Sequence, residues 1–165
     1  MRKKLIIMRH AKSSWSDPTL PDLLRPLNKR GINNSTLMAH KLQEMNIFPE
    51  YALCSYAERT KQTWGLMSKV FNTFIPTKIL PELYDTSISE VLLSISKIPK
   101  EITTLLVLFH NPTCELVYTN LTQQNEVIST ANVLILESVD KYCWKDILTH
   151  PSLWETLQVL RPKEL

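Results

Sequence analysis

Short apolar runs alternate with longer amphipathic stretches along this chain. The clearest runs are Leu5–Met8, Tyr51–Cys54 and Thr104–Phe109. Each has the length of a buried strand and is too short to cross a membrane. Residues 76–80, 131–136 and 157–160 predict three further strands.

Apolar residues recur at helical spacing in the segments between these runs. The first set begins after Asn28, a good helix cap, and ends at Pro49; its members are Ile32, Ser35, Ala39, Leu42 and Met45. A second set, Trp64, Met67 and Phe71, predicts the inner face of a helix that follows the second strand.

Capping signals predict two more helices. Ser87 with Glu90 forms a capping box for a helix that runs to about Lys97. Asn111 would cap a fourth helix, with Pro112 in its favoured first position. The resulting order β-α-β-α-β-α-β-α-β-β predicts an α/β protein, a three-layer α/β/α sandwich with a mostly parallel central sheet. We expect a single domain over residues 1–165, long enough to fold without disulfides or a structural metal.

Composition excludes several classes of protein. The net charge of +3 comes from 19 basic and 16 acidic residues that are spread along the chain, so it does not indicate nucleic-acid binding. The cysteines, Cys54, Cys114 and Cys143, are odd in number and contain no C-x-x-C pair, which favours a reduced, cytoplasmic protein. The apolar run after Lys4 is shorter than the core of a signal peptide, so we expect no export and no membrane anchor. We also expect a monomer.

Side chains that could take part in binding or catalysis follow several of the predicted strands: Arg9 with His10, then Arg59, Glu82 and His110. Taken singly, each has an ordinary explanation, such as a solvated helix arginine or a surface carboxylate at a helix start. Parallel strands, however, bring their carboxyl ends to one edge of a sheet, where ligands bind in open α/β folds. We therefore expect these residues to meet in one pocket.

The residue types in this set suit an oxyanion better than a cation. Two arginines and two histidines without a carboxylate cluster make a poor metal site and a good site for a phosphoryl group, so we expect no metal and no cofactor. Other phosphate-binding signatures are absent, since a chain with two glycines has neither G-x-x-x-x-G-K-[ST] nor G-x-G-x-x-G. The spacing from Cys54 to Arg59 leaves four residues between them, one fewer than the C-x5-R of cysteine phosphatases.

Two further features lie between the first strand and the first helix or at the start of that helix. Residues 11–26 are polar and contain Pro18, Pro21 and Pro26, which predicts a long loop of functional importance. Gly31, in the first turn of the first helix, indicates either a close backbone contact or an incidental surface glycine.

Four segments together resemble the histidine phosphatase superfamily, also called phosphoglycerate-mutase-like, and within it the small bacterial phosphohistidine phosphatases. They are Arg9-His10-Ala11-Lys12-Ser13-Ser14-Trp15, Arg25-Pro26-Leu27-Asn28-Lys29-Arg30-Gly31, Ser55-x-x-x-Arg59-x-x-Gln62-Thr63 and His110-Asn111-Pro112. The resemblance implies that His10 becomes phosphorylated and that Arg9, Arg59 and His110 bind the phosphoryl oxygens, with Arg25 as an additional pocket residue.

The chain departs from the family pattern in three places. Phe109 replaces the usual glycine before the second histidine, which would narrow the pocket, and Tyr56 replaces a small residue. The Gly-x-x-Glu-Gly segment of mutases is missing after Glu82, which favours the small phosphatase branch. Glu82 is the first candidate for a proton donor and Asp85 the second.

Three functions are consistent with these residues. The favoured one is a phosphohistidine phosphatase that acts on a signalling or phosphotransfer protein, with the loop from Ser13 to Leu24 shaping the docking of that partner. The second is a phosphatase of the same fold that acts on small phosphate esters. The third is a non-catalytic phosphate-binding module, which Phe109 would make conceivable.

Overall fold

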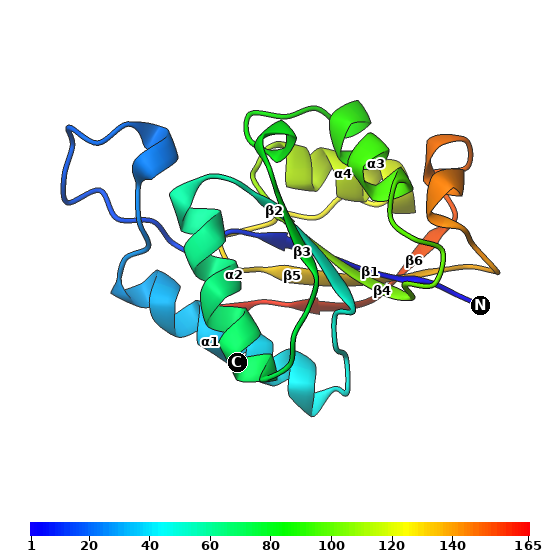
Figure 1. Cartoon of the computed structure of the whole chain (residues 1–165), viewed down its shortest axis with the longest axis horizontal. Coiled ribbons are helices and arrows are strands. Elements are labelled where there is room, and N and C mark those ends of the chain that lie inside the picture. Colours follow the sequence, from blue (N-terminus) through cyan, green and yellow to red (C-terminus); the bar gives the residue numbers. More distant parts are fainter.

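The computed structural model describes residues 1–165 and contains six strands and four α-helices (Figure 1). In chain order they are β1 (Lys4–Arg9), α1 (Lys29–Glu44), β2 (Tyr51–Ser55), α2 (Glu58–Phe71), β3 (Thr77–Leu80), α3 (Ile88–Ser96), β4 (Thr104–Phe109), α4 (Thr113–Thr122), β5 (Val133–Ser138) and β6 (Trp154–Leu160). All six strands belong to one sheet, in the order β3-β2-β4-β1-β5-β6.

The sheet is mostly parallel, as the sequence predicts. Strands β3, β2, β4 and β1 run parallel to one another, whereas β5 is antiparallel to β1, and β6 is antiparallel to β5. Strands β1 and β4 are paired along their whole length, from Lys4 opposite Thr104 to Arg9 opposite Phe109. Both strands therefore end at the same level of the same edge.

Helices cover both faces of this sheet, which confirms the three-layer architecture. Side chains of β1 alternate between the faces: Leu5 and Ile7 pack in the core under α3 and α4, and Ile6 and Met8 in the core over α1 and α2. Figure 1 shows α3 and α4 on one side of the strands and α1 and α2 on the other. A run that is apolar at every position is thus explained by burial on both faces.

The helix starts agree with the sequence in two cases and differ in a third. Asn28 accepts a hydrogen bond from the backbone N–H of Gly31, and Ser87 accepts one from Glu90. The predicted cap at Asn111 was wrong, because α4 begins at Thr113 and its N-cap residue is Pro112. The Asn111 amide instead donates to Glu115 Oε1 and to the Ile128 carbonyl, at 2.9 and 2.8 Å.

Gly31 packs directly against the chain that follows β1. A Cβ atom added to it would lie 2.2 Å from the Lys12 carbonyl oxygen, which also accepts a hydrogen bond from the Asn28 N–H. Of the two interpretations open from the sequence, the close backbone contact is correct. It fixes the start of α1 against the residues next to His10.

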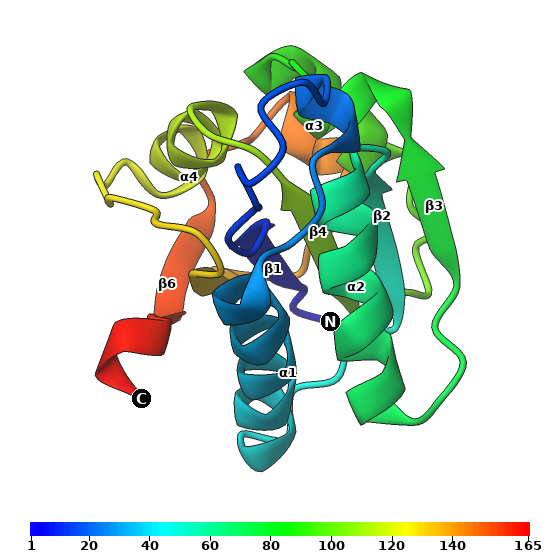
Figure 2. The same cartoon turned by 90° about the vertical axis from the view of Figure 1, so that its left-hand side faces the viewer.

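The long connection from β1 to α1 projects from the carboxyl edge of the sheet, which faces the viewer in Figure 2. Its base is closed by a β-bridge between Ser13 and Leu27, and its only regular element is a short 3-10 helix, Asp22–Leu24. No helix of the protein has both the length and the apolar character that a membrane crossing demands.

Candidate active site

His10 and His110 are the first residues after paired strands, and their rings face each other at the carboxyl edge. The last pair in the register is Arg9 with Phe109, and the His10 N–H continues the ladder by donating to the Phe109 carbonyl at 3.1 Å. The ring centroids of the two histidines lie 5.1 Å apart. Sheet pairing alone therefore brings together two residues that are one hundred positions apart in the sequence.

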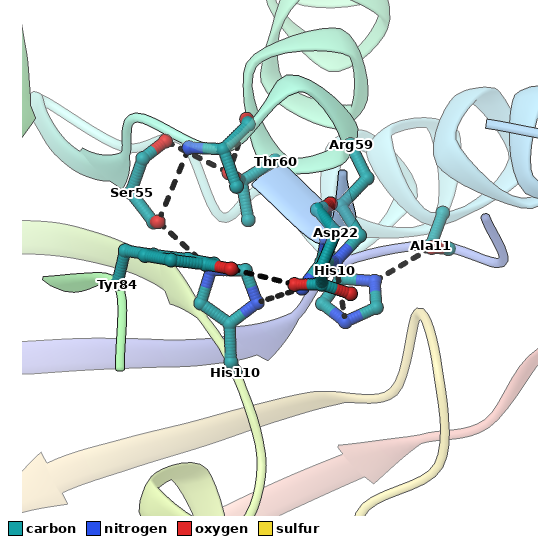
Figure 3. A network of polar contacts seen from close by, with 9 residues as sticks. His10, Ala11, Asp22, Ser55, Arg59, Thr60, Tyr84 and His110 are labelled. Carbon is teal, nitrogen blue, oxygen red and sulfur yellow. Dashed lines mark hydrogen bonds and ion pairs between the residues drawn. The ribbon is translucent and has the colours of Figure 1, made fainter. Parts of the chain in front are cut away.

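The tautomer of His10 is fixed by a backbone carbonyl. Its Nδ1 lies 2.8 Å from the Ala11 carbonyl oxygen, to which it can only donate, so the proton resides on Nδ1 (Figure 3). Its Nε2 accepts a long contact of 3.4 Å from Arg59 Nε. Burial above all, together with the charges of Arg59 and Arg9, lowers the pKa of His10 to about 4. At neutral pH, His10 is thus a neutral imidazole whose Nε2 lone pair faces Arg59.

His110 is held in the opposite tautomer. Its Nδ1 lies 3.4 Å from Arg59 Nη2, which can only donate, so the proton resides on Nε2 and is donated to Ser55 Oγ at 2.8 Å. Ser55 is the last residue of β2, the strand next to β4. Burial lowers the pKa of His110 to about 3, and the neighbouring His10 and Arg59 act in the same direction. His110 is also neutral at pH 7.

Arg59 lies between the two histidines and is buried, with 8% of its surface exposed. It is in the first turn of α2, as the sequence predicts. Its Nε points to His10, and Nη2 reaches both His110 and the carboxylate of Asp22, the latter at 3.0 Å. Its Nη1 donates to the Asp22 carbonyl at 2.7 Å. The whole guanidinium fork faces the space in front of the histidines.

Asp22 is the member of this group that the sequence did not reveal. It comes from the long connection after β1, and its carboxylate also accepts a hydrogen bond of 2.7 Å from the Tyr84 hydroxyl (Figure 3). Partial burial raises its pKa, but the hydrogen bonds from Tyr84 and Arg59 outweigh that effect and leave the pKa below its usual value. Asp22 is therefore a carboxylate at neutral pH. No spacing or motif in the loop distinguishes it from Asp17.

The other two arginines predicted for the site, Arg9 and Arg25, differ in position. Arg9 lines the space beside His10; its Nη1 donates to the Ile128 carbonyl at 3.0 Å, and its buried Nε has no partner. Arg25, predicted as a further pocket residue, is buried inside the loop instead. Its guanidinium stacks on the ring of Trp15, 3.6 Å from the centroid, and does not line the space in front of the histidines.

Two comparisons with known proteins decide the family. The sequence model of the histidine phosphatase superfamily (branch 1) matches residues 5–142. The chain belongs to this superfamily. The chain is also 29% identical to an uncharacterised chloroplastic protein of Arabidopsis thaliana. The match covers 97% of this chain and 78% of the Arabidopsis protein.

Solved structures show the same fold for this histidine phosphatase chain. The protein histidine phosphatase SixA complexed with tungstate is similar at a TM-score of 0.82 and 21% identity, covering 98% of both chains. A protein from Agrobacterium tumefaciens, provisionally named the phosphohistidine phosphatase SixA, is similar at a TM-score of 0.83 and 22% identity, covering 97% of this chain and 98% of its own.

The departures from the family pattern do not obstruct the pocket. Phe109 is fully buried in the core under α3 and α4, on the same face of β4 as Val107, so it does not narrow the space beside His110. This corrects the expectation drawn from the sequence, and the cause is the alternation of side chains along the strand. Tyr56 packs edge-on against Tyr84, with ring centroids 5.8 Å apart.

The two carboxylates considered as proton donors lie in different places. Glu82 is exposed and lines a separate hollow with Lys78, Leu93 and Lys97, so the structure does not bring it to the histidines. The reason is the 3-10 turn Pro81–Leu83, which buries Leu83 and turns the preceding side chain outward. Asp85 lines a hollow that also borders His110.

We call the space in front of the two rings the histidine pocket. It has a volume of about 270 Å³ and is lined chiefly by Arg9, His10, Lys12, Asp22, Arg59 and His110. It shares Asp22, Arg59, His110 and Asn111 with a larger hollow of about 690 Å³ that extends towards α3, here called the α3 hollow. Its donors suit a tetrahedral oxyanion. No group of three or more His, Cys, Asp or Glu side chains is arranged to hold a metal ion.

Proposed function

We propose that the protein is a phosphohistidine phosphatase that acts on a phosphorylated signalling or phosphotransfer protein. The observation that carries the proposal is the state of His10: its Nδ1 proton is held by Ala11, and its Nε2 lone pair faces the Arg59 fork. In the first step Nε2 would attack phosphorus, the P–N bond to the substrate imidazole would break, and that imidazole would leave with a proton from solvent. Water would then break the bond between phosphorus and His10 and release inorganic phosphate.

In this scheme Arg9, Arg59 and His110 would stabilise the equatorial oxygens. Phosphoryl transfer depends mainly on positioning and on stabilising charge, and a guanidinium fork supplies both. His110 is neutral in the ligand-free protein. A bound phosphoryl dianion would raise the pKa of His110, so that a protonated ring could donate to it.

The supply of protons favours an N–P substrate over an ester. An alkoxide leaving group needs a proton from a well-placed acid, whereas an imidazole can be protonated before the bond breaks. Glu82 is outside the histidine pocket, and Asp22 is ionised and therefore cannot donate. A substrate that needs no strong protein acid fits this set of residues best.

Access to the pocket suits a protein substrate. The long connection after β1 carries exposed Trp15 and Leu24, which are 63% and 52% exposed. Exposed aromatic and aliphatic side chains on a loop beside a pocket are typical of a recognition surface. The SixA proteins with the same fold are named for action on phosphohistidine.

The test compares a phosphohistidine protein with para-nitrophenyl phosphate as substrates of the wild type, Glu82→Gln and Asp85→Asn. We expect a higher kcat/KM for the phosphohistidine protein, little effect of either variant, and full activity in EDTA. Faster cleavage of the ester with strong dependence on either carboxylate would instead favour a small-molecule phosphatase. Absence of turnover and of any label on His10 with both substrates would leave only a phosphate-binding module.

A further inference from the structure

A second hollow adjoins the histidine pocket on the side of α1 and the C-terminal residues. Its volume is about 490 Å³, and it has no hydrophobic lining residue. Arg9, Lys12 and Thr130 line both spaces, so the two are continuous. We call this space the basic hollow. The first turn of α1 and the C-terminal residues flank this hollow. In Figure 2 the C-terminal segment, drawn in red, lies beside α1.

The basic hollow gathers positive charge that the protein itself does not neutralise. One of its lining residues, Glu164, is an anion, and five are cations: Arg9, Lys12, Arg30, Arg161 and Lys163. Only Arg161 is ion-paired, with Glu126 and Glu164. The side chains of Lys12, Arg30 and Lys163 have no ion pair and no hydrogen bond within the protein. Cations that share one hollow repel each other, and a bound anion would relieve that repulsion.

Arg9 adds an observation that is independent of surface charge. Its Nε is buried and has no hydrogen-bond partner, although buried guanidinium groups are normally satisfied. The only acceptor for this side chain is the Ile128 carbonyl, which binds Nη1. Because Arg9 lines both spaces, an anionic group at their junction would lie beside a guanidinium that the protein pairs incompletely.

We propose that the basic hollow binds acidic side chains of the phosphohistidine-bearing protein while its phosphoryl group occupies the histidine pocket. This inference rests on the proposed function and specifies the surface of the substrate. The charged and polar side chains that line the hollow favour an anionic occupant over a base or an acyl chain. Carboxylates are the anions that a protein surface offers, and they pair with arginine and lysine at the rim of an interface.

The space on the other side of the pocket explains why a protein surface fits better than a small metabolite. The histidine pocket opens both to the basic hollow and to the α3 hollow, and together these form a trough far larger than one phosphate ester. The α3 hollow contains the carboxylates of Asp22 and Asp85. Asp22 is paired with Arg59 there, so the α3 end of the trough carries far less positive charge than the basic hollow, and this difference orients the partner with its acidic residues towards α1.

The experiment uses two phosphohistidine peptides that differ only in the flanking residues, which are Asp and Glu in one and Asn and Gln in the other. The enzyme variant is Arg30→Glu/Lys163→Glu, since both residues are exposed and neither belongs to the catalytic machinery. The matched control is Lys69→Glu/Lys145→Glu, which makes the same change of charge at two exposed lysines outside all three spaces. Melting temperatures verify that both variants are folded.

We expect the wild type to prefer the acidic peptide through a lower KM, and the preference to weaken with salt. Arg30→Glu/Lys163→Glu should lower kcat/KM for the acidic peptide by roughly tenfold, as two exposed charge pairs allow, and leave the neutral peptide unaffected. The control variant should resemble the wild type. Equal use of both peptides by the wild type, or an equal loss in both double variants, would overturn the proposal.

Binding of the same peptides with a non-hydrolysable phosphonate in place of phosphohistidine separates this inference from the proposed function. Tighter binding of the acidic analogue by the wild type, and its loss in Arg30→Glu/Lys163→Glu, would support the basic hollow as the site for acidic side chains. If the wild type cleaved neither phosphohistidine peptide, that result would refute the proposed function alone. Should Arg30 and Lys163 instead control the KM of a small bisphosphate but not the affinity of either analogue, the anion comes from a metabolite and the proposal of an acidic partner is wrong.

Discussion

The rings of His10 and His110 lie 5.1 Å apart because the residues before them, Arg9 and Phe109, are opposite each other in the sheet. Each ring belongs to the first residue after a strand of this pair. The proton of each points away from the other ring, towards Ala11 and Ser55. The two atoms left to accept hydrogen bonds, His10 Nε2 and His110 Nδ1, both face Arg59.

This arrangement predicts that His10 is the nucleophile. His10→Ala should abolish turnover and leave the fold intact, because the ring lines the histidine pocket and belongs to neither of the two apolar cores. The measurement is turnover together with labelling by a radioactive phosphodonor, and wild-type protein should carry an acid-labile, base-stable label. His40→Ala, at an exposed site, is the control. Near-normal turnover by His10→Ala would refute the mechanism.

Arg59 should matter for catalysis much more than for stability. Arg59→Ala should cost on the order of 3 kcal/mol in kcat/KM, by analogy with the loss of one oxyanion donor. Its ion pair with the half-exposed Asp22 is worth about 1 kcal/mol or less, so unfolding should change little. Arg59→Lys should recover only part of the activity, since a point charge cannot contact two oxygens at once. A loss of stability as large as the loss of activity would indicate a structural role instead.

Asp22 occupies the donors that a phosphoryl group would need. In the ligand-free protein Arg59 Nη2 donates to the Asp22 carboxylate and Nη1 to the Asp22 backbone carbonyl, and Asp22→Asn weakens the first of these contacts. Asp22→Asn should therefore strengthen inhibition by inorganic phosphate, by about two- to fivefold for a partly exposed ion pair. Asp17→Asn, in the same loop, is the matched control. If Asp22→Asn lowers kcat without changing phosphate inhibition, the carboxylate acts on the attacking water and does not compete for Arg59.

The sequence predicts well what backbone regularity determines. Strand ends, helix starts and a parallel sheet place His10, Arg59 and His110 together, and each of these follows from local patterns. The expectation that Phe109 narrows the pocket is wrong because the residue type alone does not tell which face of β4 the side chain is on. Its neighbours Leu105 and Val107 share that face and pack in the same core.

Irregular segments explain the residues that the sequence missed or misplaced. The position of Asp22 depends on contacts with Arg59 and Tyr84, which are distant in the sequence. Glu82 has the expected strand-end position, but the 3-10 turn that buries Leu83 directs it away from the histidines. In both cases the side chain's direction is decided by tertiary packing and not by local periodicity.

The two glycines should respond in opposite ways to alanine. A Cβ at Gly31 would lie 2.2 Å from the Lys12 carbonyl, so Gly31→Ala should destabilise the protein by about 1–3 kcal/mol and shift the residues beside His10. At Gly65, in the interior of α2, an added Cβ would meet no atom within 4 Å apart from its chain neighbours and the backbone of its own helix. Gly65→Ala should stabilise by about 0.5–1 kcal/mol through helix propensity. Urea denaturation of both variants tests the pair, and a neutral Gly31→Ala would contradict the close contact.

The neutral state of the buried histidines should make folding sensitive to acid. Burial lowers the pKa values of His10 and His110 to about 4 and about 3, whereas an unfolded histidine has a pKa of about 6.5. Between these values the unfolded state binds more protons, so the free energy of unfolding rises with pH up to about 6.5 and falls as the pH decreases below it. Each histidine should remove roughly 2 kcal/mol between pH 8 and pH 5.

Other groups also titrate in this range, so the test compares slopes and not absolute stabilities. Urea denaturation at pH 8 and pH 5 should give a smaller loss for His110→Gln than for the wild type, by roughly the contribution of one histidine, about 2 kcal/mol. His40→Gln, which removes an exposed histidine, should keep the wild-type loss. The charges next to the pair, Arg9, Arg59 and Asp22, are unchanged in both variants. An identical loss in the wild type and His110→Gln would mean that this ring is protonated in the folded protein, contrary to its hydrogen bond with Arg59.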